Sequence, residues 1–396
     1  MLLPNHNLNE FWDDAISKTE GLKSAALLQR QFSCFAEGER IATDIISTLC
    51  QQDQSSPKPA HRVYIDGRPA HDWFFSRNNK PLADESIQDW SERCFGDQSF
   101  CIVLTKISDY SEDYTRAVAK LLSPLMPTKL EQLGCPNPFV AAGFFLGNYD
   151  KTPFGIHIDD PELKSVLHIH LGPGSKRMTV WPASHPEFSN RKIIHEGIES
   201  HLNSGKTYTI EPGDAFFLPA GGCYHIGENQ SLSLALTIGI NDFRNNLRKI
   251  VKESLKHSAG NTKTTSNQDP KNELQQLIDH QAYQRISNEH LPPCITPHKA
   301  LPPVLRGTIK RVAPFKLQLR TTDQHDAKLI YARGHRLKQM ASAASETLIK
   351  KINSDFEINI ENWLNEQLTP IERTNQAALI RELHAVNAID MEVKEN

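Results

Sequence analysis

Hydrophobic and polar residues change their pattern twice along the chain. Between about residues 138 and 241 they form short runs rich in the β-branched and aromatic residues that favour strands: FVAAGFFLGNY, KSVLHIHL, RMTVWP, KTYTI, DAFFLPA and SLSLALTIGI. Residues 231–240 alternate small or polar residues with aliphatic ones, as a half-buried antiparallel strand does. The turn sequences GPGS, EPGD and AGG separate the runs. Many short strands at close spacing predict a sandwich or a small barrel.

Helical periodicity flanks this stretch on both sides. In the first 137 residues, segments such as GLKSAALLQRQFSCFAEGERIATDIISTLCQQ place apolar residues at helical spacing. Residues 256–272 form a polar linker, and the proline-rich HLPPCITPHKALPPV marks a second boundary. Two short strands (FKLQLR and AKLIYAR) and three helical segments follow, in an order similar to that of winged-helix modules. We therefore predict four parts: a mixed, mostly helical N-terminal region packing on the core (1–137), a β core (138–255), a linker with a helical segment (256–304) and a small α/β winged-helix-like domain (305–396).

Composition and charge limit the class of protein. The 396 residues carry a net charge of −3, with 38% hydrophobic and 23% charged residues, which argues against a surface devoted to nucleic acid. The 7 cysteines are scattered and lack a CxxC pair, as expected of reduced thiols and not of a disulfide framework or zinc ribbon. We see no signal peptide and no apolar stretch near the ~20 residues that span a bilayer. We therefore expect a cytoplasmic protein without a membrane partner.

One strand end carries metal-binding chemistry. In FGIHIDD, His157 and Asp159 stand two residues apart, so an extended chain places both on one face. An imidazole and a carboxylate suit a first-row divalent metal, and one more histidine would complete the two-histidine, one-carboxylate set of non-haem Fe(II). His225, in LPAGGCYHIGEN after the EPGD turn and an apolar strand, is the best third ligand. The alternative is an edge strand with ordinary polar residues.

The order of these motifs resembles a known family. HxD is followed by a turn and a strand opening with cations (GPGSKRMTVWP), then by EPGDAFFLP, a histidine and an alternating strand. The chain is similar here to the JmjC-type, cupin-like Fe(II)/2-oxoglutarate-dependent oxygenases, which include protein hydroxylases acting on asparaginyl and ribosomal-protein residues. The resemblance covers about residues 138–245 closely. It implies a mostly β catalytic core, a double-stranded β-helix or jelly-roll, with His157, Asp159 and His225 as metal ligands.

The resemblance also implies residues for the cosubstrate. Lys176 matches the cation that pairs with the distal carboxylate of 2-oxoglutarate, because a buried dicarboxylate needs a fixed positive partner. The adjacent Arg177 could take this role instead, since the turn length decides which of the two points inward. Tyr149 and Thr152 could hydrogen-bond the same carboxylate. Asn241 falls where the family often places a polar side chain near the cosubstrate.

Two further histidines keep several interpretations open. His168 and His170, in VLHIHL, share a strand face. They could line the substrate site, compete as metal ligands, or be hydrogen-bonded histidines of the barrel, and the last interpretation is favoured.

The activity implied by the resemblance is that of a dioxygenase. It would use Fe(II), 2-oxoglutarate and O2 to hydroxylate a C–H bond of a protein or peptide side chain, releasing succinate and CO2. Alternatives are the same chemistry on a small molecule or carrier-bound amino acid, removal of N-methyl groups, and a cupin-like binding protein without catalysis.

The C-terminal part suggests partners less directly. Residues 306–338 carry nine Lys and Arg residues against Asp323 and Asp326. We favour a charged solvated face over a nucleic-acid surface, so no nucleic-acid partner is expected. Oxygenases that resemble this one and act on ribosomal proteins are expected to have a helical dimerisation segment beside such a module. Here a homodimer would use about residues 272–290.

Overall fold

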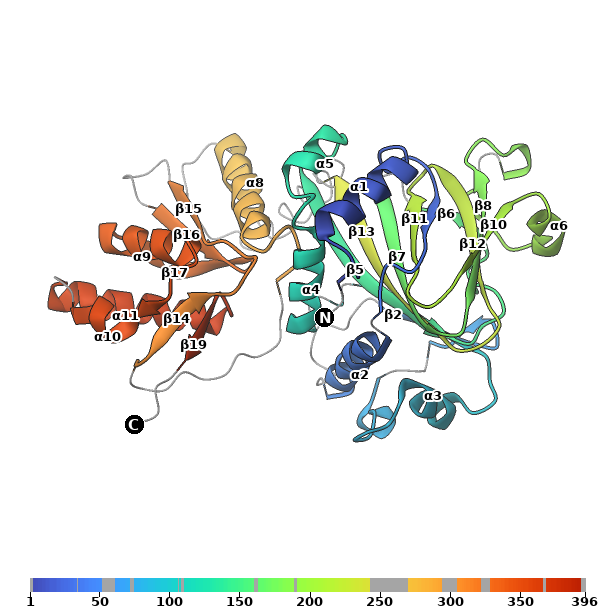
Figure 1. The fold of residues 1–396 in the computed structure, drawn as a ribbon, viewed down its shortest axis with the longest axis horizontal. Coiled ribbons are helices and arrows are strands. Elements are labelled where there is room, and N and C mark those ends of the chain that lie inside the picture. Colours follow the sequence, from blue (N-terminus) through green and yellow to red (C-terminus); the bar gives the residue numbers. More distant parts are fainter. Residues whose placement is uncertain are drawn as a thin grey trace. The chain divides into compact units, whose positions relative to one another are not determined.

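The protein divides into two compact units, residues 1–245 and residues 246–396, in a computed structural model (Figure 1). The described residues are 3–33, 35–51, 61–71, 75–105, 107, 110–159, 163–188, 191–242, 270–293, 305–321, 328–365 and 368–392. Most of the predicted linker and of the proline-rich boundary, at 243–269 and 294–304, lies outside them.

Two antiparallel sheets form the centre of the first unit. The strands of the larger sheet are β1 (Ala26–Leu28), β2 (His61–Ile65), β3 (Arg68–Pro69), β4 (Phe100–Thr105), β5 (Pro138–Gly147), β7 (Leu163–Pro173), β11 (Ala215–Pro219) and β13 (Ser233–Asp242). Those of the smaller sheet are β6 (Ile156–Ile158), β8 (Lys176–Pro182), β9 (Ile193–Ile194), β10 (Lys206–Ile210) and β12 (Cys223–Asn229). The strand orders are β1-β11-β7-β13-β5-β4-β2-β3 and β10-β8-β12-β6-β9.

The chain crosses repeatedly between these sheets from β5 to β13. Strands β5, β7, β11 and β13 lie together in the larger sheet, and β6, β8, β10 and β12 lie together in the smaller one. This exchange is that of a jelly-roll, or double-stranded β-helix, whose two sheets face each other across a shared interior. The predicted mostly β core is therefore confirmed.

Helices cover the larger sheet and the ends of the barrel (Figure 1). They are α1 (Leu8–Lys18), α2 (Phe35–Gln51), α3 (Ile87–Phe95), α4 (Glu112–Leu122), α5 (Thr128–Gln132) and α6 (Ile198–Leu202). The N-terminal region also supplies β1 to β4 to the larger sheet, so it contributes more strand than its helical periodicity suggests. Two pairings join these strands to the core, β4 with β5 (Val103 opposite Phe145) and β1 with β11, and no local pattern records those partners.

Packing shows which face of each strand points into the barrel. On β7, Leu171 packs against α2 so closely that a Cβ on Gly38 would lie 2.1 Å from its Cδ1. Val166, on the opposite face, packs against the cluster that contains Met178 and Val180 of β8. Since side chains alternate along a strand, even-numbered residues of β7 and of β8 face the interior between the sheets.

The second unit has its own core. One sheet joins β14 (Thr308–Arg311), β18 (Ile358–Asn359) and β19 (Ile389–Glu392), and the other joins β15 (Gln318–Thr321), β16 (Lys328–Ala332) and β17 (His335–Ala341). The helices are α8 (Pro270–Ile286), α9 (Ala343–Asn353), α10 (Ile360–Asn365) and α11 (Pro370–Ala385). A capping box of Thr369 and Glu372 begins α11. The three predicted helical segments are present, and the winged-helix likeness stays a prediction. No helix among the described residues of either unit combines the length and apolar character needed to cross a bilayer.

Candidate metal and cosubstrate site

Strand alternation on β6 brings His157 and Asp159 to the interior. Ile156 and Ile158 pack on the outer face, in the cluster that contains Trp181 and Tyr224. His157 and Asp159 therefore project from the opposite face. His225 lies directly opposite His157 in the pairing of β12 with β6, and neighbouring residues in such a pair share a face. Local alternation and the strand register together assemble the three side chains.

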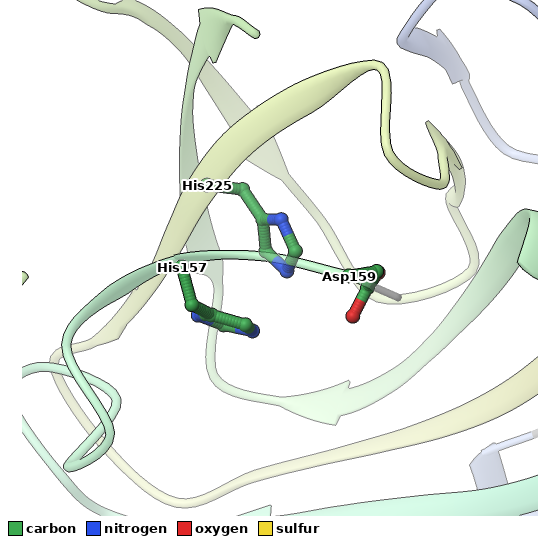
Figure 2. Close-up of side chains that lie close together, drawn as sticks. All are labelled: His157, Asp159 and His225. Atoms are coloured by element: carbon green, nitrogen blue, oxygen red, sulfur yellow. The ribbon is translucent and has the colours of Figure 1, made fainter. Parts of the chain in front are cut away.

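The three predicted ligands converge (Figure 2). One donor atom from each of His157, Asp159 and His225 lies within 4.8 Å of the others. The two imidazole centroids are 4.1 Å apart. The Nδ1 of His157 lies 3.0 Å from the carbonyl oxygen of Gly155, to which it donates, so Nε2 is left as the ligand atom.

The electrostatics keep both imidazoles in the neutral form that binds metal. Burial, and then the charges of His225 and Arg62, lower the pKa of His157 well below its usual value. Burial lowers the pKa of His225 to about 4, and the charge of Lys176 acts in the same direction. The Nδ1 of His225 has no hydrogen-bond partner of good geometry among the described residues. The nearby Cys223 backbone raises the pKa of His225, but less than burial lowers it. Two neutral imidazoles and one carboxylate on a shared face fit Fe(II).

Lys176 lies on the same interior face as the triad. His225 is opposite Val180 in the pairing of β12 with β8, and Lys176 is four residues before Val180, so the three share that face. Lys176 is 4% exposed, while the side chain of Arg177 is 46% exposed and lies 4.0 Å from Glu228. The turn before β8 therefore sends Lys176 inward and Arg177 outward.

The buried ammonium of Lys176 has no carboxylate partner in the described part of the chain. Its Nζ donates to the Tyr149 hydroxyl at 3.2 Å and lies 5.3 Å from the centre of the Phe145 ring. Burial lowers the pKa of Lys176 to about 8. An ammonium held in this way has the position and the unmet charge to bind an anion.

Tyr149 and Thr152 lie next to Lys176 but differ in what they can offer. Burial raises the pKa of Tyr149, so its hydroxyl stays protonated and can donate while it accepts from Lys176. The Thr152 hydroxyl donates to the Gly227 carbonyl at 2.7 Å and accepts from the Gly227 amide at 2.8 Å. Its proton is therefore already used by the backbone. A Cβ on Gly227 would lie 3.1 Å from the Lys176 Cε, so glycine leaves room for the lysine.

Asn241 is not brought to this group. Its Nδ2 donates to the Phe139 carbonyl at 3.3 Å, near the end of β13. The other end of β13, at Ser233, is the one that pairs with Pro173 in the turn before Lys176.

The structure separates the two histidines of β7. The Nε2 of His170 lies 2.6 Å from the Gly174 carbonyl oxygen, which anchors this side chain to the turn. His168 shares the interior face, and its Nδ1 is buried without a hydrogen-bond partner in the described structure.

The sequence interpretation missed Arg62 of β2, an exposed residue that lies beside the site. Arg62 lies opposite Val103 of β4, and its guanidinium is 5.1 Å from the centre of the Phe154 ring. Phe154 in turn meets the ring of His157 at 4.7 Å. No motif surrounds Arg62, and only the long-range pairing of β2 with β4 brings it to the metal ligands.

Comparison with known proteins gives weak similarities. No protein-family model and no curated protein matches the chain. An X-ray structure of Escherichia coli YcfD is similar with 14% identity and a TM-score of 0.49, covering 99% of this chain and 100% of that one. YcfD in complex with cobalt and 2-oxoglutarate, described as a ribosomal oxygenase, is similar with 14% identity and a TM-score of 0.48, covering 97% of this chain and 99% of that one. Bacillus subtilis oxalate decarboxylase matches 28% of this chain and 24% of its own, with 16% identity and a TM-score of 0.18.

Proposed function

We propose that this protein is an Fe(II)- and 2-oxoglutarate-dependent oxygenase that hydroxylates a C–H bond of a protein or peptide side chain, with release of succinate and CO2. The observation that carries the proposal is Lys176, a buried ammonium without a carboxylate partner among the described residues, on the interior face that also presents the triad. A metal site without an anionic ligand would leave this charge unmatched.

The energetics support an anionic ligand at Lys176. An ammonium taken out of water loses several kcal/mol of hydration, which a neutral phenol returns only in part. A dicarboxylate that reaches the metal with one end and Lys176 with the other supplies the missing charge. Gly227 lies opposite Met178, between Lys176 and His225 on the interior face. Because glycine has no side chain, it leaves space for a ligand that extends from Lys176 to the metal ligands.

Each residue then has a defined task. His157, Asp159 and His225 would hold Fe(II), which with 2-oxoglutarate bound supplies the oxidising power for insertion of oxygen into a C–H bond. The hydrogen bond from His157 to Gly155 fixes the orientation of its ring. Lys176 and Tyr149 hold the distal carboxylate, and apolar neighbours such as Met178 and Val180 keep water out.

Arg62 supports a polypeptide as the substrate. Its guanidinium makes no ion pair with the described residues and lies over Phe154, beside His157. It is exposed and can donate hydrogen bonds to the carbonyl and carboxylate oxygens of a bound chain. The YcfD structures are described as those of a ribosomal oxygenase, so ribosomal proteins are the first polypeptides to test. A cytoplasmic location and a homodimer stay predictions.

The cofactor pair is tested by anaerobic titration of metal-free protein with Fe(II) and 2-oxoglutarate, followed by the visible charge-transfer band of the chelate. We expect the band in wild type, its loss in His157→Ala, and a need for much more 2-oxoglutarate in Lys176→Met. Arg177→Met, which removes the neighbouring exposed cation, should behave as wild type. Absence of the band in folded wild-type protein would contradict the oxygenase and favour a cupin-like binding protein.

The substrate is tested with the loaded enzyme and purified ribosomal proteins in air. We expect one protein to gain the mass of one oxygen atom at a single residue, with stoichiometric succinate. Succinate that forms without any modified polypeptide, and rises with a small molecule instead, would contradict the polypeptide substrate and leave the cofactor pair intact.

A further inference from the structure

Strand β9 is the edge strand of the smaller sheet, and it lies beside the strand that carries the first metal ligand. Among the described strands it pairs only with β6. Ile193 is opposite His157, and paired residues share a face, so Ile193 lies on the side of the sheet that carries the triad. Ile194 is opposite Ile156, and both pack in the cluster on the outer face. The free edge of the sheet is therefore one strand away from the metal ligands.

The backbone of Ile193 points to this free edge. The Ile158 amide donates to the Lys192 carbonyl at 3.2 Å, so these two residues form a hydrogen-bonded pair of the antiparallel ladder. Such pairs alternate with non-hydrogen-bonded ones, which makes the neighbouring pair of His157 and Ile193 a non-hydrogen-bonded pair. The N–H and C=O of Ile193 therefore point away from β6, and neither has a hydrogen-bond partner among the described residues. They offer one donor and one acceptor to an incoming strand.

Strand β9 is held in place although it is only two residues long. The Tyr224 hydroxyl donates to the Arg191 carbonyl at 2.6 Å, which anchors the segment before the strand. Gly155 lies so close to β9 that a Cβ there would collide with the Ile194 carbonyl oxygen. Ile194 is buried, whereas the side chain of Ile193 is 49% exposed. A large apolar side chain and two outward backbone groups are thus fixed at the edge nearest to the triad.

We infer that an extended segment of the polypeptide substrate adds to β9 as one more strand, an assignment that rests on the proposed function. The N–H of Ile193 donates to a carbonyl of the segment, and its C=O accepts from an amide of the segment. Main-chain hydrogen bonds of this kind hold peptides at sheet edges, while side chains provide the specificity. Since paired residues share a face, the substrate residue opposite Ile193 presents its side chain on the side that carries the triad.

The short length of β9 favours a substrate segment over a second copy of this chain. Within β9 only Ile193 directs its backbone groups to the edge, whereas a stable dimer buries about 1,200–2,000 Å². Two hydrogen bonds and one apolar contact suit a segment that is bound, modified and released. Their place beside His157 puts that segment where the chemistry occurs.

The test compares Ile193→Pro with wild type in air, with Fe(II) and 2-oxoglutarate. The probe is the set of peptides that a glutamate-specific protease releases from purified ribosomal proteins, and mass spectrometry follows the gain of one oxygen atom. Proline removes the N–H and is tolerated where a strand N–H points outward. We expect modification at low peptide concentration to slow about tenfold, because a hydrogen bond is lost and the ring blocks the edge. Ile193→Val, which keeps the N–H, should restore the rate to within about twofold of wild type.

A cofactor titration separates this inference from the proposed function. The charge-transfer band with Fe(II) and 2-oxoglutarate should be the same in wild type and Ile193→Pro, because the triad and Lys176 are unchanged. Absence of the band in wild type would contradict the proposed function itself. A band without any modified peptide in wild type would contradict the polypeptide substrate, and the inference with it, while the cofactor pair stays intact.

The remaining outcomes address the edge alone. Equal rates for Ile193→Pro and wild type would overturn the inference. A loss that Ile193→Val shares in full would assign the effect to the side chain and would also overturn the backbone pairing. If Ile193→Pro loses the band, the same contact is tested in wild type with target peptides in which single backbone amides are replaced by esters. One ester should slow modification about tenfold, and a peptide without any sensitive amide would overturn the inference.

Discussion

Replacement of Lys176 by methionine should stabilise the free protein while it abolishes tight binding of 2-oxoglutarate. Methionine keeps the length of the side chain and removes the charge. The pKa of Lys176 falls from 10.5 to about 8 on folding because the side chain is buried. That difference corresponds to a cost of about 3 kcal/mol for holding the charged form at neutral pH. Loss of the hydrogen bond to Tyr149 offsets about 1 kcal/mol, so we expect a net gain of about 2 kcal/mol in the free energy of unfolding.

The pH dependence of this gain has a definite sign. Below pH 8 lysine is charged in both states and the folded protein carries the full cost. Between pH 8 and 10.5 the unfolded chain binds more protons than the folded one, so wild-type stability rises with pH. The advantage of Lys176→Met should therefore be largest below pH 8 and vanish above about 10.5.

Urea unfolding, followed by tryptophan fluorescence, measures this effect on the transition of the first unit, which contains the buried Trp12, Trp90 and Trp181. Wild type in Co(II) should gain about 2.7 kcal/mol from 2-oxoglutarate at a hundred times its dissociation constant, and Lys176→Met should gain little. Arg177→Met, which removes an exposed cation that points away from the interior, should leave the gain from 2-oxoglutarate unchanged. The reasoning is refuted if Lys176→Met is less stable than wild type without cosubstrate and still gains fully from 2-oxoglutarate, because Lys176 would then be a structural residue.

Three further predictions address neighbouring features. Affinity of the Co(II)-loaded protein for 2-oxoglutarate, measured by calorimetry, should fall about tenfold per pH unit above pH 8, because Lys176 loses its proton there. This pH dependence should be absent in Lys176→Met. A wild-type affinity that does not change with pH would argue against a charged partner. Gly227→Ala places a Cβ 3.1 Å from the Lys176 Cε, so the same titration should show 2-oxoglutarate binding weakened by about tenfold, or about 1.4 kcal/mol. Unchanged 2-oxoglutarate binding would mean that the lysine moves aside freely. Thr369→Ala removes the capping box of α11 and should lower the stability of the second unit by about 1 kcal/mol in a thermal melt followed by circular dichroism, without effect on 2-oxoglutarate binding.

The sequence predicted those parts of the site that depend on local geometry. His157 and Asp159 are two residues apart in an extended strand, so their common face follows from alternation alone. His225 follows a turn and an apolar strand whose order is visible in the sequence. These features made the common face of His157 and Asp159 and the mostly β core predictable from local pattern. His225 was selected by the order of the motifs, and its approach to His157 depends on the pairing of β12 with β6.

The rest depends on register and on long-range pairing. The choice between Lys176 and Arg177 depends on the turn from β7 to β8, where the pairing of β13 with β7 shifts between Leu234 and Ala235. The two histidines of β7 share a face, and only the Gly174 carbonyl distinguishes them, by anchoring His170. Arg62 reaches the site through β2, which no motif connects to β6.

The register between β8 and β12 has a consequence for folding fidelity. A slip by one residue would turn Lys176 outward and present Arg177 to the interior, because successive side chains face opposite ways. The same slip would also expose Met178 and Val180, which pack in the core with Phe216 and Leu218. The apolar residues of β8, which take no part in the chemistry, therefore determine which of two adjacent cations serves the site.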